Sequence, residues 1–158
     1  MTEIFVDGGH SKQSGTEAWG SVMDSSGKDL LENNNFLLTD VVIKKEKLPR
    51  GERNVIVAKF NDVTSQQNNG AELLAFYAGL KIALQYGHKI INCDSQLLVE
   101  WWGKGHVNSA KAKTMDPNKY KFILACGELR KLFEKRGGKI VKISGDKNIA
   151  DLFSHYKG

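Results

Sequence analysis

Residues 90–96 read Ile-Ile-Asn-Cys-Asp-Ser-Gln, an apolar run that ends in an acid and continues into a predicted helix. The run has the length of a short buried strand, and Ser95 is a residue type that caps helix N-termini. On the other side, apolar residues within 73–84 recur at helical spacing, and Gly87 ends that helix. A strand enclosed by helices is typical of an α/β sheet. The stretch therefore predicts a mixed α/β fold.

The remaining segments extend this sheet in both directions. We predict a mixed five-stranded sheet, with the first three strands antiparallel, flanked by helices. Strands are expected at residues 3–7, 18–23, 90–93 and 139–143, with a return strand beginning within 29–38. Two β-rich runs, 41–47 and 54–60, are separated by Pro49 and Gly51 and predict an extra β-hairpin region around 41–60. Helices are expected at residues 70–86, 95–102, 120–135 and 148–155.

Length and composition limit the class of protein. The 158 residues suit one domain over residues 1–158, and the 41% hydrophobic and 26% charged residues are near the globular average. Cys93 and Cys126 form neither a CxxC pair nor a disulfide framework. No apolar run has membrane-spanning length, and the N-terminus lacks a secretory signal pattern. We therefore expect a cytoplasmic monomer with no membrane association and no obligatory protein partner.

Positive charge is concentrated in the C-terminal third of the chain. Residues 1–103 carry a net charge of −3, whereas residues 104–147 carry a net charge of +8. A basic segment on a slightly acidic chain is typical of proteins that bind a polyanion, most often nucleic acid. A solvated Lys-rich helix would give the same pattern, so charge alone leaves both interpretations open.

Four acids interrupt apolar stretches of the sequence. Asp7 and Asp94 follow apolar runs at predicted strand ends, Glu72 lies in the first turn of a predicted helix, and Asp151 has apolar neighbours. Acids rarely enter such surroundings unless they are paired or bind cations. Each acid alone also has an ordinary structural explanation, such as a turn, a helix cap, a favourable charge at a helix N-terminus or partial exposure.

Together, the four acids predict a metal site. If strands 3–7 and 90–93 are neighbours, Asp7 and Asp94 meet at one edge of the sheet, and the helices carrying Glu72 and Asp151 can face the same point. Such a cluster cannot stay ionised without cations, and oxygen-only ligands favour Mg²⁺ or Mn²⁺. Two such ions roughly 4 Å apart form the clamp used for in-line phosphoryl displacement.

Four segments together resemble the four-acid pattern of type I ribonuclease H: Val6-Asp7-Gly8-Gly9, Asn68-Asn69-Gly70-Ala71-Glu72, Cys93-Asp94-Ser95-Gln96 and Asn148-Ile149-Ala150-Asp151-Leu152. The order of the acids and of the surrounding elements matches from residue 4 to about residue 155. The resemblance implies a single-domain ribonuclease H-like fold. It also implies endonucleolytic hydrolysis of the RNA strand of RNA–DNA hybrids, leaving 5′-phosphate and 3′-hydroxyl ends. The Lys- and Asn-rich composition suits an AT-rich genome, such as that of a phage or virus.

The resemblance assigns catalytic and metal-binding roles to Asp7, Glu72, Asp94 and Asp151. These acids would hold two Mg²⁺, with Mn²⁺ as the alternative, one ion activating a water and the other stabilising the leaving 3′ oxygen.

The resemblance also assigns substrate-binding roles. Asn68 and Gln96 match positions that touch the minor groove, where 2′-hydroxyls mark RNA, and Asn69 is a further candidate. Gly8 matches a position where the backbone approaches the RNA strand.

A basic, Trp-containing segment falls where many family members carry a nucleic-acid-binding arm. Its candidate substrate-binding residues are Trp101, Trp102, Lys104, Lys111 and Lys113, the lysines contacting phosphates. Because adjacent helical residues point about 100° apart, we expect one of the two tryptophans to be a core residue.

Several features depart from the family pattern. The mobile His that the family often places before the last acid is absent, because position 141 is Val, and His155 is no obvious substitute. Asn148 precedes Asp151 by three residues, whereas the family usually has four. The extra hairpin carries five cations, which would either contact the substrate or protect a solvated edge strand: Lys44, Lys45, Lys47, Arg50 and Arg53.

Two other functions remain open at this stage. One is a different nuclease of the same superfamily, a junction resolvase or an exonuclease. The other is a nuclease-dead module that binds hybrids or structured RNA without cutting. The presence of all four acids favours the enzyme.

Overall fold

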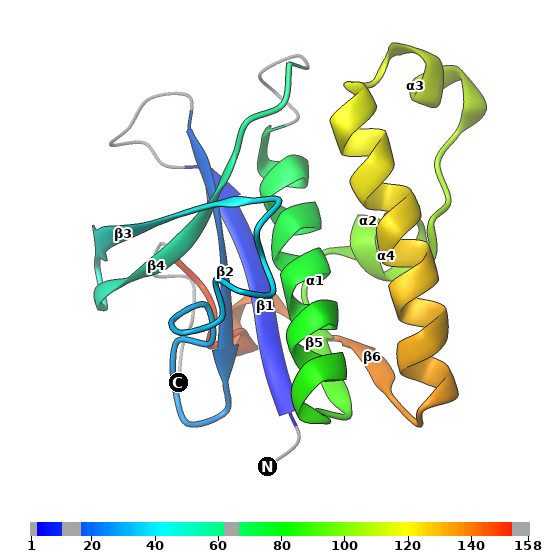
Figure 1. Ribbon diagram of the computed structural model, residues 1–158. Coiled ribbons are helices and arrows are strands. Elements are labelled where there is room, and N and C mark those ends of the chain that lie inside the picture. The colour runs from blue at the N-terminus through cyan, green and yellow to red at the C-terminus, as the bar shows by residue number, and fades with distance from the viewer. Residues whose placement is uncertain (1–2, 11–16, 62–66, 153–158) are drawn as a thin grey trace.

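Six strands form one mixed sheet in the order β3-β4-β2-β1-β5-β6 (Figure 1). The computed structural model describes residues 3–10, 17–61 and 67–152. Its strands are β1 (Glu3–His10), β2 (Ala18–Asp24), β3 (Val42–Leu48), β4 (Gly51–Ala58), β5 (Ile90–Cys93) and β6 (Lys139–Lys142). Its helices are α1 (Gln67–Tyr86), α2 (Gln96–Glu100), α3 (Ser109–Thr114) and α4 (Pro117–Lys135), with short 3-10 helices η2 (Trp102–Lys104) and η3 (Gly145–Lys147).

The sheet is antiparallel on one side of β1 and parallel on the other. β1 pairs antiparallel with β2, β2 with β4, and β4 with β3, whereas β5 lies parallel to β1 and β6 parallel to β5. This topology confirms the predicted fold class at the level of a mixed α/β sheet flanked by helices. Among the described residues the sheet has six strands rather than the predicted five, because both strands of the extra hairpin join it and the predicted strand within 29–38 does not form.

The predicted return strand within 29–38 is wrong. Only one isolated bridge, between Met23 and Asp29, continues the ladder of β2, and residues 30–41 form turns. Asn33 has a positive φ of 67°, which a strand does not accommodate. The place beside β2 is taken by β4, whose residues 54–58 are buried and mostly β-branched.

β1 is longer than predicted and runs through its two glycines. The ladder with β2 continues over Gly8, Gly9 and His10, which pair with Gly20, Trp19 and Ala18. Two adjacent glycines weaken a strand because of their conformational freedom. Close packing explains Gly8: a Cβ there would lie 2.4 Å from the backbone nitrogen of Glu72 in α1.

α1 is the central helix of the core and is buried on nearly all sides. It packs on β1, β2 and β4 with one face and on α4 with another. Helical periodicity predicted this element, and its N-terminus lies three residues earlier than expected, at Gln67. Buried residues of α1 include Leu73, Leu74, Phe76, Tyr77, Leu80 and Ile82. A helix of this kind anchors the fold, because it removes apolar surface from water all around its circumference.

The second helical layer lies beside α1 and carries the basic segment. α4 packs against α1 and η2, and α3 sits on the connection between η2 and α4 (Figure 1). The chain crosses α4 closely at Gly105, because a Cβ on Gly127 would lie 2.8 Å from the Gly105 Cα. Ile123, Cys126 and Phe133 of α4 are buried, whereas Leu132 is 39% exposed and does not belong to the core.

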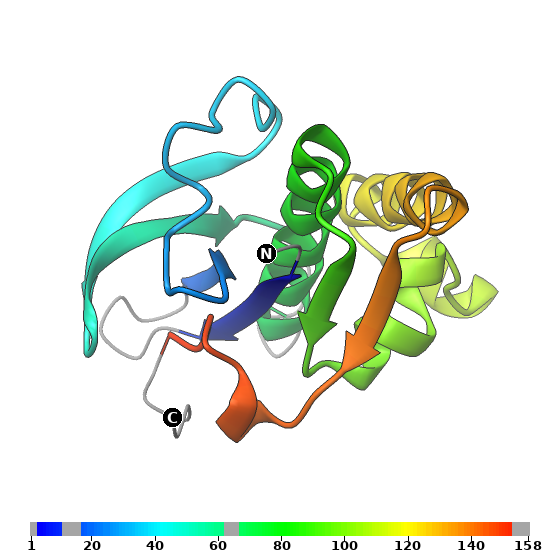
Figure 2. The ribbon, with the colours of Figure 1, turned by 90° about the horizontal axis from the view of Figure 1, so that it is seen from below.

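The other face of the sheet is covered by the C-terminal segment. Figure 2 shows the helices on one side of the sheet and the chain after η3 on the other. Leu152 packs there against Trp19, Val55 and Val57 in a second, smaller hydrophobic cluster. The predicted helix at 148–155 is wrong over residues 148–152, which form turns, and residues 153–158 lie outside the described part of the chain.

Two further expectations concern the cysteines and the membrane. Cys93 and Cys126 are buried free thiols, in agreement with the sequence. Among the described residues, no helix combines the length and the apolar character that crossing a membrane requires.

The contact between Gly8 and α1 makes a prediction about stability. We expect Gly8→Ala to lower the free energy of unfolding by about 1–3 kcal/mol, because the new Cβ overlaps the α1 backbone and that backbone cannot move aside freely. Urea denaturation of both proteins measures the difference. Gly145→Ala is the control, because its Cβ would lie 3.6 Å from the Asp94 carboxylate, an ordinary contact. Equal stability of Gly8→Ala and wild type would contradict the packing argument.

Candidate metal-binding site

Three acids converge at the carboxyl ends of β1 and β5. Val6 is the register partner of Cys93 in the parallel ladder, so the next residues, Asp7 and Asp94, lie side by side. Glu72 reaches the same point from the first turns of α1. One carboxylate oxygen from each of Asp7, Glu72 and Asp94 lies within 4.8 Å of the others. The structure thus brings together three of the four acids singled out in the sequence.

The fourth acid, Asp151, is also buried, at 3% exposure. It approaches from the segment that crosses the sheet face opposite α1. Its negative charge contributes to the raised pKa of Asp7, which places it near the other acids although it lies outside the 4.8 Å group.

Burial and like charges raise the pKa of two acids in the cluster. For Asp7, burial is the main cause, followed by the negative charges of Asp94 and Asp151. For Glu72, burial again comes first, followed by the charges of Asp7 and Asp94. Each group alone resists ionisation in this environment. A cation at the cluster would remove this resistance.

The chemistry of the cluster fits a hard divalent cation. All of its donors are carboxylate oxygens, which Mg²⁺ and Mn²⁺ prefer. Glu72 Oε2 is buried and has no hydrogen-bond partner among the described residues. A buried carboxylate oxygen without a hydrogen-bond partner is unfavourable unless a ligand binds to it. Asp7, Glu72 and Asp94 are therefore the residues that would hold a metal, with Asp151 next to them.

Asn148 organises the site and was not among the residues assigned a role from the sequence. Its buried side-chain amide donates to the Val6 carbonyl at 2.9 Å and to Asp94 Oδ2 at 3.2 Å. Its Oδ1 accepts the backbone N–H of Ala150 at 3.1 Å. Asn148 therefore links β1, Asp94 and the turn that carries Asp151. The Asn in the last motif was the only signal, and its unusual spacing from Asp151 obscured it.

The predicted substrate-binding residues near the acids lie at helix starts. Asn68 and Gln96 are exposed, and Asn69 is half-buried, in the first turns of α1 and α2. They lie within four positions of Glu72 or Asp94 along the chain. Gly8 is accounted for by its contact with α1, and a role for its backbone in binding stays a prediction.

The two adjacent tryptophans differ, as expected. Trp101 is 58% exposed, whereas Trp102 is 3% exposed and packs in the core. The substrate contact predicted for Trp102 does not fit this burial. Lys104, Lys111 and Lys113 are exposed, the last two on α3, whose residues are all outside the core. A substrate contact by these lysines stays a prediction.

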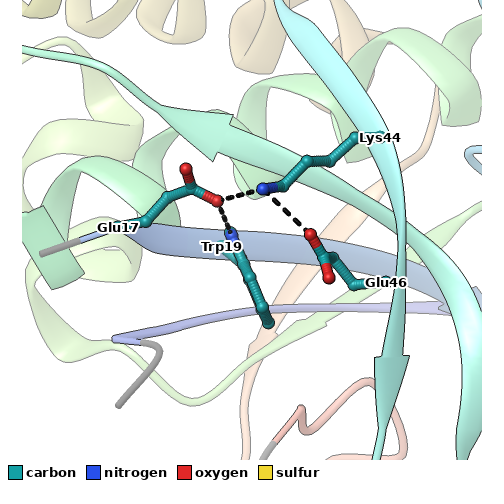
Figure 3. A network of polar contacts seen from close by, with 4 residues as sticks. All are labelled: Glu17, Trp19, Lys44 and Glu46. Atoms are coloured by element: carbon teal, nitrogen blue, oxygen red, sulfur yellow. Dashed lines mark hydrogen bonds and ion pairs between the residues drawn. The ribbon is translucent and has the colours of Figure 1, made fainter. Parts of the chain in front are cut away.

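The cations of the extra hairpin do not behave as one group. Lys44 lies on the edge strand β3 between Glu17 and Glu46, and the Trp19 indole donates to Glu17 at 2.5 Å (Figure 3). The ion pair with Lys44 lowers the pKa of Glu17 and raises that of Lys44. Lys44 is thus engaged within the fold, whereas Lys45 and Lys47 point into solvent. Both arginines contact the segment that carries Asp151.

Comparison with known proteins finds similar solved structures. No family model matches the chain, and no curated protein matches it. The chain is similar to the crystal structure of RNase H1 from the halophilic archaeon Halobacterium salinarum NRC-1, with 18% identity and a TM-score of 0.47. The similarity covers 94% of this chain and 89% of that one. At this identity and TM-score it says nothing about the reaction of this chain, and nothing supports a phage or viral origin.

The raised pKa values predict how stability depends on pH without metal. A carboxyl whose pKa is raised in the folded state binds more protons there than in the unfolded chain, so stability falls as pH rises above about 4. We expect Asp7→Asn in chelator-containing buffer to be more stable than wild type at pH 7. The advantage should shrink as pH falls from 7 toward about 4 and vanish below it, where both carboxyls are protonated in the folded and the unfolded wild type.

Urea unfolding at pH 3.5, 5 and 7 measures this effect, and Glu100→Gln, which removes an exposed charge on α2, is the control. If the wild type in chelator were more stable at pH 7 than Asp7→Asn, the argument that the clustered carboxylates destabilise the metal-free fold would be wrong.

Proposed function

We propose that this chain is a metal-dependent endonuclease that hydrolyses the RNA strand of RNA–DNA hybrids. The observation that carries the proposal is the convergence of Asp7, Glu72 and Asp94 within 4.8 Å, with Asp151 beside them. Burying several like charges together is costly, and a fold accommodates the arrangement when cations neutralise it. An all-oxygen site at strand ends, beside exposed polar and basic residues, suits phosphoryl transfer on nucleic acid.

In this proposal the carboxylates hold divalent cations, and the surrounding residues fix the carboxylates. When bound, such cations supply Lewis-acid activation of a water and neutralise charge that develops on the phosphate. Asp7 and Asp94 are fixed by the β1–β5 ladder, and Asn148 orients Asp94 through its amide. Glu72 is fixed by α1, which Gly8 allows to lie against β1. This preorganisation matters because ligand positions decide where the water and the scissile phosphate meet.

Substrate recognition is assigned to residues around the acids. Asn68 and Gln96 are exposed at the helix starts next to Glu72 and Asp94, where they suit contacts to the 2′-hydroxyls that distinguish RNA from DNA. α3 lies toward the same end of the molecule as the N-terminus of α1 (Figure 1). Its exposed Lys111 and Lys113 suit phosphate contacts along the hybrid. In this proposal Asn68 and Gln96 provide selectivity for RNA, and Lys111 and Lys113 contribute to the affinity for the hybrid.

Cleavage of an end-labelled RNA–DNA hybrid tests the proposal. We expect internal cuts in the RNA strand with Mg²⁺ or Mn²⁺ and none in EDTA. Asp94→Asn should lower the rate by roughly 100-fold or more, because a lost metal ligand removes several kcal/mol of transition-state stabilisation. Duplex RNA, duplex DNA, branched DNA and single-stranded RNA serve as the alternative substrates.

The controls separate the proposed enzyme from the other functions. Glu100→Gln, which removes an exposed acid away from the cluster, should cleave like wild type. Preferential cutting of branched or duplex DNA would contradict hybrid specificity and indicate a resolvase or an exonuclease instead. Tight hybrid binding without cleavage in either metal would contradict the proposed nuclease activity and indicate a binding module.

The basic residues of α3 predict a salt-dependent contribution to binding. We expect Lys111→Met/Lys113→Met to weaken hybrid binding and to reduce the slope of log Kd against log salt concentration by about 1 for each lysine. Binding is measured by fluorescence anisotropy in EDTA, at salt concentrations between roughly 50 and 200 mM.

Lys28→Met is the matched control, because Lys28 is exposed in the turn after β2, at the opposite end of the sheet from Asp7. An unchanged slope in the α3 variant would remove α3 from the proposed interface while leaving the cleavage proposal intact.

A further inference from the structure

Two arginines of the extra hairpin converge on the main chain that carries Asp151. Arg50 Nη2 donates to the Ile149 carbonyl and to the Asp151 carbonyl, each at 2.7 Å. Arg53 Nη2 also donates to the Asp151 carbonyl. A single backbone oxygen thus accepts from two guanidinium groups. Charge-assisted hydrogen bonds of this kind are stronger than those between neutral groups.

The segment with Asp151 depends on such contacts for its position. Residues 148–152 form turns, held within the segment by the Asp151 N–H donating to the Asn148 carbonyl at 3.1 Å. Asn148 ties the beginning of the segment to β1, and Ser21 Oγ donates to the Ala150 carbonyl at 2.5 Å. The arginines hold its other end. They add polar contacts at the Asp151 carbonyl, next to the apolar packing of Leu152.

The hairpin that presents the arginines is itself well fixed. Arg50 lies in the turn between β3 and β4, next to Pro49, whose ring restricts φ. Arg53 lies on β4, and the adjacent Asn54 is bound to Asp29 through its backbone and side-chain nitrogens, both at 2.8 Å. The donors are therefore presented from a rigid support rather than from a free loop.

The charge around Arg53 is consistent with this arrangement. Burial and then the like charge of Arg50 lower the pKa of Arg53, and the negative charges of Asp29, Asp151 and Asp7 act against that effect. The guanidinium consequently lies within electrostatic range of two of the clustered acids while its hydrogen bond goes to a carbonyl. It balances negative charge near the cluster without occupying the carboxylates.

We propose that Arg50 and Arg53 are positioning residues, which hold the backbone of residues 149–151 so that Asp151 faces the acid cluster as a metal ligand. This inference rests on the proposed function, because it gives Asp151 a role in metal binding. It also replaces both sequence-based interpretations of these two arginines, substrate contact and edge protection. Each guanidinium donates to the Asp151 carbonyl, and Arg53 Nη1 donates to Met23 Sδ as well, so both arginines are engaged within the protein and act through Asp151.

Mn²⁺ binding in the absence of nucleic acid tests the inference, because no substrate contact can contribute to it. Isothermal titration calorimetry compares wild type, Asp151→Asn, Arg53→Met, Arg50→Met, Arg53→Lys and the double variant Asp151→Asn/Arg53→Met. We expect Asp151→Asn and Arg53→Met each to weaken Mn²⁺ binding by roughly 10-fold or more, and Arg53→Lys to restore part of the affinity. The double variant should bind within about 2-fold of Asp151→Asn alone, because both changes remove the same ligand.

The controls distinguish failure of the inference from failure of the proposed function. Lys45→Met removes an exposed cation from the same hairpin and should bind Mn²⁺ like wild type. Far-UV circular dichroism at the titration temperature verifies that every variant is folded.

Absence of Mn²⁺ binding by the wild type would overturn the proposed function and the inference together. Three other results would overturn the inference alone: full affinity in both arginine variants, full affinity in Asp151→Asn, or losses that add in the double variant.

Discussion

The mutual repulsion of buried carboxylates is the constraint on which the site depends. Three acids are held with oxygens within 4.8 Å of one another, and burial raises the pKa of two of them. Such an arrangement persists because each acid is fixed by a different rigid element: Asp7 by β1, Asp94 by the end of β5 and Glu72 by α1. The glycine at position 8 lets the helix approach the strand closely enough for this. The fold thus stores an unfavourable charge arrangement that a cation would relieve.

The face of the sheet opposite α1 has a different construction. It is covered by a segment of turns. The Asn148 amide of this segment donates to the backbone of β1, and side chains from β2 and the extra hairpin donate to the segment's carbonyls. Leu152 closes a small apolar cluster there with Trp19, Val55 and Val57. This apolar cluster attaches the segment to the sheet, and the polar contacts fix the conformation of the segment. The extra hairpin therefore belongs to the site as well as to the sheet edge.

The sequence allowed the strands and helices around Asp7, Glu72 and Asp94 to be predicted, because their periodicity is local, whereas the helix predicted around Asp151 is wrong over residues 148–152. The acids were found as charges within apolar runs, and the parallel neighbours β1 and β5 bring two of them together as expected. The segment 29–38 was misassigned, because its leucines are buried by turns rather than by a ladder. The roles of Asn148, Arg50 and Arg53 were beyond sequence reasoning, since the hydrogen bonds that define these roles join residues 54 to 142 positions apart.

Those long-range contacts have a consequence for how the molecule assembles. Closing a loop of about 100 residues has an entropic cost that must be met before the contacts at its ends form. The hairpin β3–β4 closes locally, but Asp151 takes its place only when the segment after η3 has been synthesised and has crossed the sheet. Asp7, Glu72 and Asp94 all precede this segment in the chain, so they are synthesised before Asp151. The full acid set therefore requires a contact between the first and last described parts of the chain.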